Sequence, residues 1–147
     1  MSVTAPNALY SRDMLALAVE LAQYPYDQAA PLTGEARSRA CGSVLSLSGH
    51  PAGEGGGLEK IGLRASTCAV GQASAAIFLR GAYGKNQAQL EDVRGQLERW
   101  LADEGEAPAW PDLEILAPAL AFPARHGAIL LPWKAALSAL SSPAIAR

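Results

Sequence analysis

The change of residue pattern between positions 61 and 79 constrains the fold most, because it places a strand directly before a helix. From Ile61 to Thr67 apolar side chains alternate with small or polar ones, which is typical of a strand with one buried face. From Val70 onwards Ala and Ser dominate, which predicts a closely packed helix. Cys68 lies between the two and is therefore predicted to lie beside the unpaired N–H groups of a helix N-terminus.

The expected position of Cys68 gives its thiol three chemical roles. The aligned dipoles of a helix N-terminus favour a thiolate over a thiol. A thiolate there could act as a nucleophile, a metal ligand or a sulfur acceptor. Cysteine is also common as a small buried apolar residue, and position alone does not separate that structural role from the chemical ones.

Length and composition limit the class of protein. The 147 residues predict one domain, 1–147, of which half are apolar and 18% are charged. A net charge of −2 without a basic cluster argues against a nucleic-acid partner. We find neither an apolar stretch of about 20 residues nor a signal peptide, so we expect a cytoplasmic protein without a membrane partner. Its two cysteines are then expected to be reduced and reactive, or metal-binding.

The first half of the chain predicts a helix followed by strands. An apolar stripe that Asn7 caps and Pro25 ends indicates an amphipathic helix; its members are Tyr10, Met14, Leu17, Ala18 and Leu21. After a loop at 27–34, the pattern predicts short strands at 36–40 and 44–48. The glycine-rich run 49–57 leads into a strand and not a helix, so we interpret it as a flexible hairpin loop with His50 in solvent at its tip.

The second half predicts helices. Asn86 and Gln89 form the pattern of a capping box before a surface helix with an apolar stripe that runs to Leu101. Asp112 is expected to cap a short helix that Pro118 closes, and Pro132 is expected in the first turn of the last helix. Residues 141–147 are expected to form a frayed tail. One helix, three short strands and then three or four helices predict an α+β fold with an antiparallel sheet covered by helices on one face.

Three segments of the chain resemble one known family. Residues 40–44, Ala-Cys-Gly-Ser-Val, are similar to a segment that carries the family's first cysteine and an acidic ligand. Residues 67–75, Thr-Cys-Ala-Val-Gly-Gln-Ala-Ser-Ala, are similar to the helix that follows its second cysteine. Residues 122–125 and 131–135 flank the place of its third cysteine. On these motifs the chain resembles the IscU/SufU/NifU N-terminal domain family of iron–sulfur cluster assembly scaffolds, and is most similar to the SufU branch.

The resemblance implies the site residues and also shows where the chain departs from the family. Cys41 and Cys68 match the first two cysteines and would be sulfur acceptors and metal ligands. In a gap-free alignment the acidic ligand falls on Ser43, the third cysteine on Ala128, and the histidine that often precedes it on Gly127.

Two thiolates leave a four-coordinate metal or cluster site incomplete. The remaining ligands could come from His126, which lies two positions before the lost cysteine, from water, from a small thiol, from a partner protein, or from a second copy of the chain. The implied cargo is a transient iron–sulfur cluster or iron. Zinc is a further candidate, although Ser43 offers it a weak neutral oxygen in place of a carboxylate.

The resemblance implies a scaffold or sulfur-carrier protein, and not an enzyme, whose partners are a cysteine desulfurase and acceptor apo-proteins, with homodimer formation as one way to complete the site. Two other hypotheses remain. The chain could be a binding or structural module that keeps the fold without cluster chemistry, or an enzyme with a Cys68–His126 pair. The resemblance further predicts that Cys41 and Cys68 lie side by side, close enough to form a disulfide in air, and that Ala128 lines the same pocket.

Overall fold

The computed structural model describes residues 12–40, 42–53 and 55–141 of the chain. The predictions that concern Asn7, Tyr10 and Cys41, and the tail from 142 onwards, lie outside the described residues. The elements are α2 (Arg12–Glu20), η1 (Leu21–Gln23), β1 (Leu32–Ser38), β2 (Ser43–Ala52), β3 (Gly57–Ser66), α3 (Ala69–Ala82), α4 (Gln87–Leu101), η2 (Leu113–Ala121), η3 (Pro123–Arg125) and α5 (His126–Leu140). This order confirms the α+β fold.

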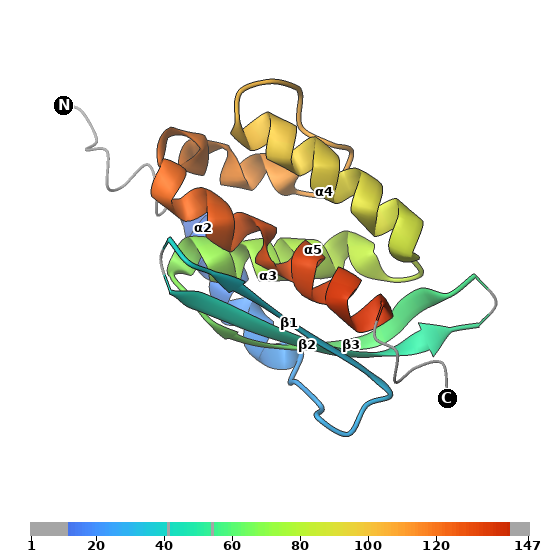
Figure 1. Cartoon of the computed structure of the whole chain (residues 1–147). Helices are drawn as coiled ribbons and strands as arrows, with labels where there is room; N and C mark the ends of the chain where they lie inside the picture. Colours follow the sequence, from blue (N-terminus) through green and yellow to red (C-terminus); the bar gives the residue numbers. More distant parts are fainter. Residues whose placement is uncertain (1–11, 41, 54, 142–147) are drawn as a thin grey trace.

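The helices form two layers over one face of the sheet (Figure 1). Helix α5 packs on β1 and β2, and α3 packs on β3 and on α5. Helix α4 contacts α5 from the outer side, and α2 packs against α3. Phe78, Trp110 and Trp133 meet within this core, with ring centroids 5.2 to 5.8 Å apart. No helix in the described part of the chain has the length and hydropathy that a membrane crossing requires.

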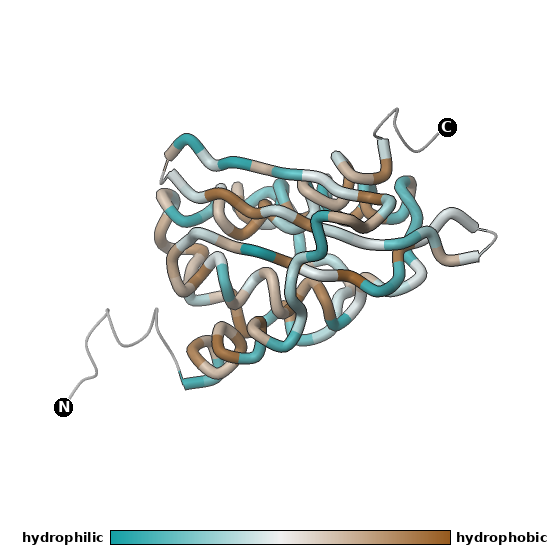
Figure 2. The backbone as a smooth tube through the Cα atoms, turned by 90° about the horizontal axis from the view of Figure 1, so that it is seen from below, coloured by the Kyte–Doolittle hydropathy of each residue, from teal (hydrophilic) through white to brown (hydrophobic). Residues whose placement is uncertain are grey.

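The sheet is antiparallel throughout, in the order β1-β2-β3. Leu45 and Leu47 of β2 pair with Ala65 and Leu63 of β3, and all four side chains face the helices or pack against the core. The residues between them face the other way, and this alternation of hydropathy along the strands is visible in Figure 2, which views the molecule from the sheet side. The predicted strand that ends just before Cys68 is therefore confirmed.

The glycine-rich run is not a long flexible loop. Strand β2 continues to Ala52 and β3 begins at Gly57, so that His50 pairs with Glu59 and is half-buried. A distant turn holds this extension: the Leu58 N–H donates to the Lys85 carbonyl (3.2 Å), and the Gly84 N–H donates to the Leu58 carbonyl (2.8 Å). These long-range bonds pair backbone groups that would bind water in a free loop.

Strand β1 also differs from the prediction, because it begins at Leu32 and ends at Ser38. Gly34 explains why this segment pairs although the sequence favours a loop. A Cβ at Gly34 would collide with the Ala135 carbonyl and the Ala139 nitrogen, so only glycine lets α5 approach the strand this closely.

The last helix begins at His126 and contains Pro132 in its interior, so the predicted start at Pro132 is wrong. A proline inside a helix removes one donor and displaces the carbonyls of the preceding turn. Here the buried Ser74 hydroxyl of α3 donates to the Ile129 carbonyl (2.7 Å), one of that turn. A hydroxyl from another helix therefore binds the carbonyl next to that of Ala128, which loses its helical donor to Pro132.

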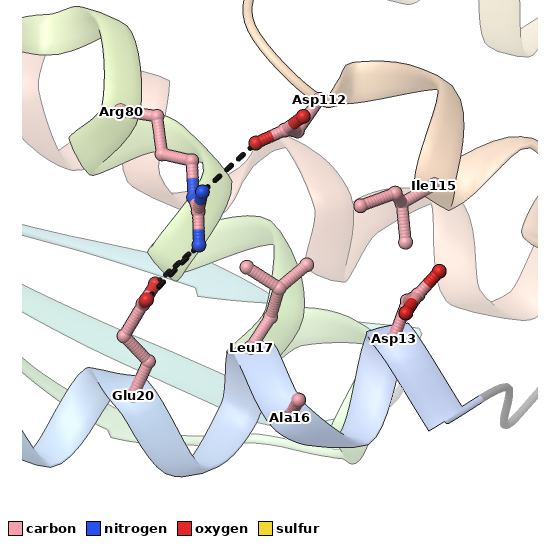
Figure 3. Close-up of a pocket in the computed structure, with 7 residues that line it drawn as sticks. All are labelled: Asp13, Ala16, Leu17, Glu20, Arg80, Asp112 and Ile115. Atoms are coloured by element: carbon pink, nitrogen blue, oxygen red, sulfur yellow. Dashed lines mark hydrogen bonds and ion pairs between the residues drawn. The ribbon is translucent and has the colours of Figure 1, made fainter.

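Asp112 does not cap η2, and Pro118 does not close it, since η2 continues to Ala121. The Asp112 carboxylate instead accepts a hydrogen bond from Arg80 (2.9 Å), whose guanidinium also binds Glu20 (2.7 Å). Figure 3 shows Arg80 between the two carboxylates at the edge of a hollow of about 300 Å³. This partly exposed ion-pair group links α2, α3 and η2 and contributes about 1 kcal/mol or less per pair.

Candidate functional site

Cys68 is the N-cap residue of α3, as the sequence predicts. Its backbone is extended (φ −70°, ψ 172°), and its carbonyl accepts the first helical hydrogen bond from the Gln72 N–H (3.0 Å). The side chain is a free thiol that is partly exposed and makes no capping hydrogen bond. A helix N-terminus with a thiol in place of a capping oxygen leaves its first N–H groups available to negative charge.

The residue before Cys68 fixes the junction between β3 and α3. The Thr67 hydroxyl donates to Ser43 Oγ (2.7 Å) and lies 4.0 Å from Cys68 Sγ. The Gln72 side chain donates to the Thr67 carbonyl (3.1 Å). A Cβ at Gly71 would collide with the Thr67 side chain, so glycine makes room for it. These contacts tie the thiol-bearing junction to the first residue of β2.

The turn between β1 and β2 carries the other cysteine of interest, and Cys41 itself is outside the described residues. Its neighbour Gly42 has a positive φ of 69° and donates its N–H to the Ser38 carbonyl (2.9 Å). Ser43 is buried and pairs with Ser38 across the strands. A hollow of about 200 Å³ opens beside this turn; Arg37, Ser38, Arg39, Gly42, Ser43 and Val44 line it.

The first turn of α5 reaches the same end of the sheet. A Cβ at Gly127 would collide with the Ser38 hydroxyl, so the helix start lies directly against the end of β1. The segments that contain Ser43, Cys68 and Gly127 thus converge, and Figure 1 shows the β1–β2 turn and the starts of α3 and α5 at one end of the molecule. Ala128 is fully buried.

His126 lies at the start of α5 and its ring is already engaged. A carbonyl can only accept, so His126 Nε2 carries the proton of the 3.1 Å hydrogen bond to the Leu120 carbonyl. Nδ1 is therefore the nitrogen that remains for a metal or a proton. Within the described ranges, His, Cys, Asp and Glu side chains nowhere form a group of three or more that could hold a metal ion. The predicted pairing of Cys41 with Cys68 and the pocket role of Ala128 stay predictions.

Sequence reasoning missed the residues that position this site. Gly127 packs against the Ser38 side chain, and the Thr67 hydroxyl donates to Ser43 Oγ. A single Ser or Thr in a strand has no sequence pattern that would predict such a contact. The register of the sheet could have revealed the second contact, since Val44 pairs with Ser66 and so brings the residues on either side together.

Comparisons with known proteins agree with this architecture. No protein-family model and no curated protein matches the sequence. Among solved structures, the N-terminal part of a nitrogen-fixing NifU-like protein from Brucella abortus superposes with a TM-score of 0.81 at 22% identity, over 93% of this chain and 95% of that one. A protein assigned as an iron–sulfur cluster assembly scaffold of the SUF system, from the thermophilic Fervidobacterium islandicum AW-1, gives a TM-score of 0.76 at 20% identity, over 92% and 98%. The chain therefore has the fold shared by the NifU N-terminal domain and SufU.

Proposed function

We propose that this protein is a scaffold or sulfur carrier for iron–sulfur cluster assembly. The observation that carries the proposal is the partly exposed thiol of Cys68 at the N-terminus of α3, tied through Thr67 and Ser43 to the turn that contains Cys41. The likeness in fold to a NifU-like protein and to an assigned SufU scaffold supports it.

The first chemical step is persulfide transfer. The Cys68 thiolate attacks the outer sulfur of a persulfide on a cysteine desulfurase; a new S–S bond forms at Cys68 Sγ, the original S–S bond breaks, and the desulfurase cysteine leaves as a thiolate. Cys41 is the second acceptor in this proposal.

Iron, or a nascent cluster, is the cargo of the second step. Cys41 and Cys68 supply two thiolates, whereas a cluster or a tetrahedral metal needs four ligands. His126 can contribute only through Nδ1 while Nε2 donates to Leu120. Water, a small thiol, a partner protein or a second copy of the chain supplies the rest, and zinc could occupy the same thiolates.

The proposal implies a set of partners. A cysteine desulfurase donates the sulfur and acceptor apo-proteins receive the cluster, while a homodimer would bring four thiolates together. The role requires no catalytic activity of its own, no nucleic acid and no membrane, and we place it in the cytoplasm as one domain, 1–147.

Anaerobic reconstitution tests the proposal directly. The purified chain is mixed with a cysteine desulfurase, cysteine and ferrous iron, and persulfide, bound iron and cluster absorbance are measured. We expect sulfur on the cysteines and iron that is lost in Cys41→Ser and Cys68→Ser variants. If the protein acquires no persulfide and binds no iron, the proposed function is ruled out.

A binding module without cluster chemistry is the second candidate. Two observations favour it: the Ser43 hydroxyl is engaged by Thr67, and Ala128 is a fully buried methyl where the family has a ligand. Metal analysis of freshly purified protein separates the two. Near-stoichiometric iron or zinc that depends on Cys68 eliminates this candidate.

The third hypothesis, a Cys–His enzyme, needs His126 to activate Cys68. Within the described part of the chain, the one hydrogen bond of the His126 ring goes to the Leu120 carbonyl and not to Cys68. Alkylation of Cys68 at a rate that His126→Ala leaves unchanged would exclude the pair.

A further inference from the structure

A polar hollow lies across the three strands of the sheet. It has a volume of about 380 Å³, which is in the range of small-molecule sites. Its lining residues come from all three strands, the loop before them and α5: Tyr26, Thr33, Gly34, Glu35, Ser46, Arg64 and Ser138. None of these residues belongs to the cysteine site.

Three of the lining residues form one row across the strands. Glu35 of β1 pairs with Ser46 of β2, and Ser46 pairs with Arg64 of β3. Residues that lie directly opposite each other in a sheet project to the same face. The hollow thus has a carboxylate on one side, a guanidinium on the other, and a hydroxyl between them.

Ser46 is the unusual member of this row. It is only 6% exposed, yet its hydroxyl forms no hydrogen bond with any described residue. Trp133 Nε1 is the single side-chain nitrogen or oxygen of the described residues that is buried without a partner, so the Ser46 hydroxyl reaches the solvent of the hollow. A ligand in the hollow can therefore hydrogen-bond to Ser46 while it lies between the two opposite charges.

The charged groups beside Ser46 are held ready. The Arg64 guanidinium lies 4.5 Å from the centroid of the Tyr26 ring and has no ion-pair partner in the described ranges. Backbone bonds fix both flanks of Tyr26, because the Leu63 N–H donates to the Tyr24 carbonyl (2.8 Å) and the Asp27 N–H donates to Ser48 Oγ (2.9 Å). Arg64 is therefore positioned before any ligand arrives.

Glu35 also remains available. One of its oxygens lies 3.3 Å from Arg37 Nε, in an ion pair whose two side chains are 50% and 67% exposed. Exposed pairs of this kind are weak and exchange readily with other partners. A ligand cation can therefore use the Glu35 carboxylate.

We propose that this hollow binds a free α-amino acid as its zwitterion. The ligand carboxylate pairs with Arg64 and accepts a hydrogen bond from the Ser46 hydroxyl, and the ligand ammonium pairs with Glu35. A simple anion would face the Glu35 carboxylate, and a simple cation would face Arg64. Only a molecule with both charges uses the whole row.

Titration of the full-length protein with three small probes tests the charge pattern. Amide signals of the three strands are followed by NMR in a buffer without carboxylates or amines, on addition of glycine, acetate or methylammonium. We expect saturable shifts at Ser46 and Arg64 with glycine, with a dissociation constant of about 1 to 10 mM for so small a ligand, and binding of either half-probe weaker by about tenfold or more.

Variants then assign the contacts. Arg64→Gln and Glu35→Gln should each weaken glycine binding about tenfold, because each leaves one ligand charge unpaired. The exposed Arg99→Gln on α4 and Cys68→Ser are the controls and should bind glycine like the wild type. Amide signals far from the hollow show that each variant is folded.

Three results would overturn the proposal. Acetate that binds as well as glycine, with no effect of Glu35→Gln, would make the hollow a plain anion site. Methylammonium that binds as well as glycine would make it a cation site. If glycine causes no saturable shift at concentrations well above the expected dissociation constant, the hollow holds only water.

Discussion

Helices α3 and α4 follow each other in the chain, and their N-termini are capped differently. Asn86 caps α4 with a complete capping box, in which its side chain accepts from the Gln89 N–H and its own N–H donates to the Gln89 side chain, both at 2.9 Å. Cys68 begins α3 with a free thiol and no side-chain cap. The capping box at the start of α4 stabilises the helix. The start of α3 lacks such a capping bond, which is worth about 1 kcal/mol, and places a thiol beside unpaired N–H groups instead.

The surroundings of the two starts differ in the same sense. The α4 cap is exposed and uses contacts within its own first turn. The start of α3 is held from outside, by Ser43 through Thr67, and it lies in a convergence of three chain segments. The start of α3 is thus positioned by distant parts of the chain and not by a side-chain cap of its own.

Supplying the two ligands that the family resemblance places at Ser43 and Ala128 should give the largest effect. In a Ser43→Asp, Ala128→Cys double variant, a carboxylate and a third thiolate join Cys41 and Cys68, and zinc affinity should rise by about tenfold or more. Competitive zinc titration of the wild type, both single variants and the double variant measures it. Because Ala128 is fully buried, thermal unfolding must show that each variant is folded.

Unchanged zinc affinity in the folded double variant would mean that the Ala128 side chain points away from the cysteines. The gap-free alignment of α5 with the family would then be wrong, and His126 or groups from outside the chain would have to supply the remaining ligands.

Glycine-to-alanine substitutions in α3 and α4 should change the free energy of unfolding in opposite directions. Gly71→Ala in α3 forces the Thr67 side chain away from Ser43, and we expect a net loss of about 1 kcal/mol in unfolding free energy although alanine favours a helix. Gly95→Ala in α4 meets no atom within 4 Å and should gain about 0.5 to 1 kcal/mol. Urea unfolding of both variants gives the comparison, and a gain in Gly71→Ala would show that Thr67 is not held tightly.

Cap substitutions should give effects of similar or smaller size, again with opposite signs. Asn86→Ala removes the capping box and should cost about 1 kcal/mol, whereas Cys68→Ser supplies a better capping oxygen and should gain about 0.5 kcal/mol. Both are measured by urea unfolding under reducing conditions. If Cys68→Ser destabilises the protein, the thiol serves packing more than chemistry.

Local patterns predicted the elements whose signals are local. The alternation before Cys68, the helix after it and the Asn86 capping box are all confirmed, because each depends on residues a few positions apart. His50 and the start of α5 were predicted wrongly, because their structure depends on distant partners: Leu58 bonds to the turn at Lys85, and Ser74 bonds to Ile129.

The same distinction applies to the candidate site. The position of Cys68 follows from a strand–helix junction that the sequence shows directly. The contacts of Ser43 with Thr67, and of Ser38 with Gly127, arise only when three separate segments meet. Asp112 shows how a local rule fails, since a long-range ion pair with Arg80 takes the carboxylate that would otherwise cap η2.

Mapping the transferred sulfur tests whether Cys68 accepts sulfur from a cysteine desulfurase. The wild type and a Cys68→Ser variant are incubated anaerobically with a cysteine desulfurase and cysteine, free persulfides are trapped by alkylation, and peptides are identified by mass spectrometry. We expect one added sulfur atom on the wild-type peptide that contains Cys68, and its loss in the variant while α3 stays folded. A wild-type Cys68 that remains an unmodified thiol, with the desulfurase shown to be active, would contradict the account.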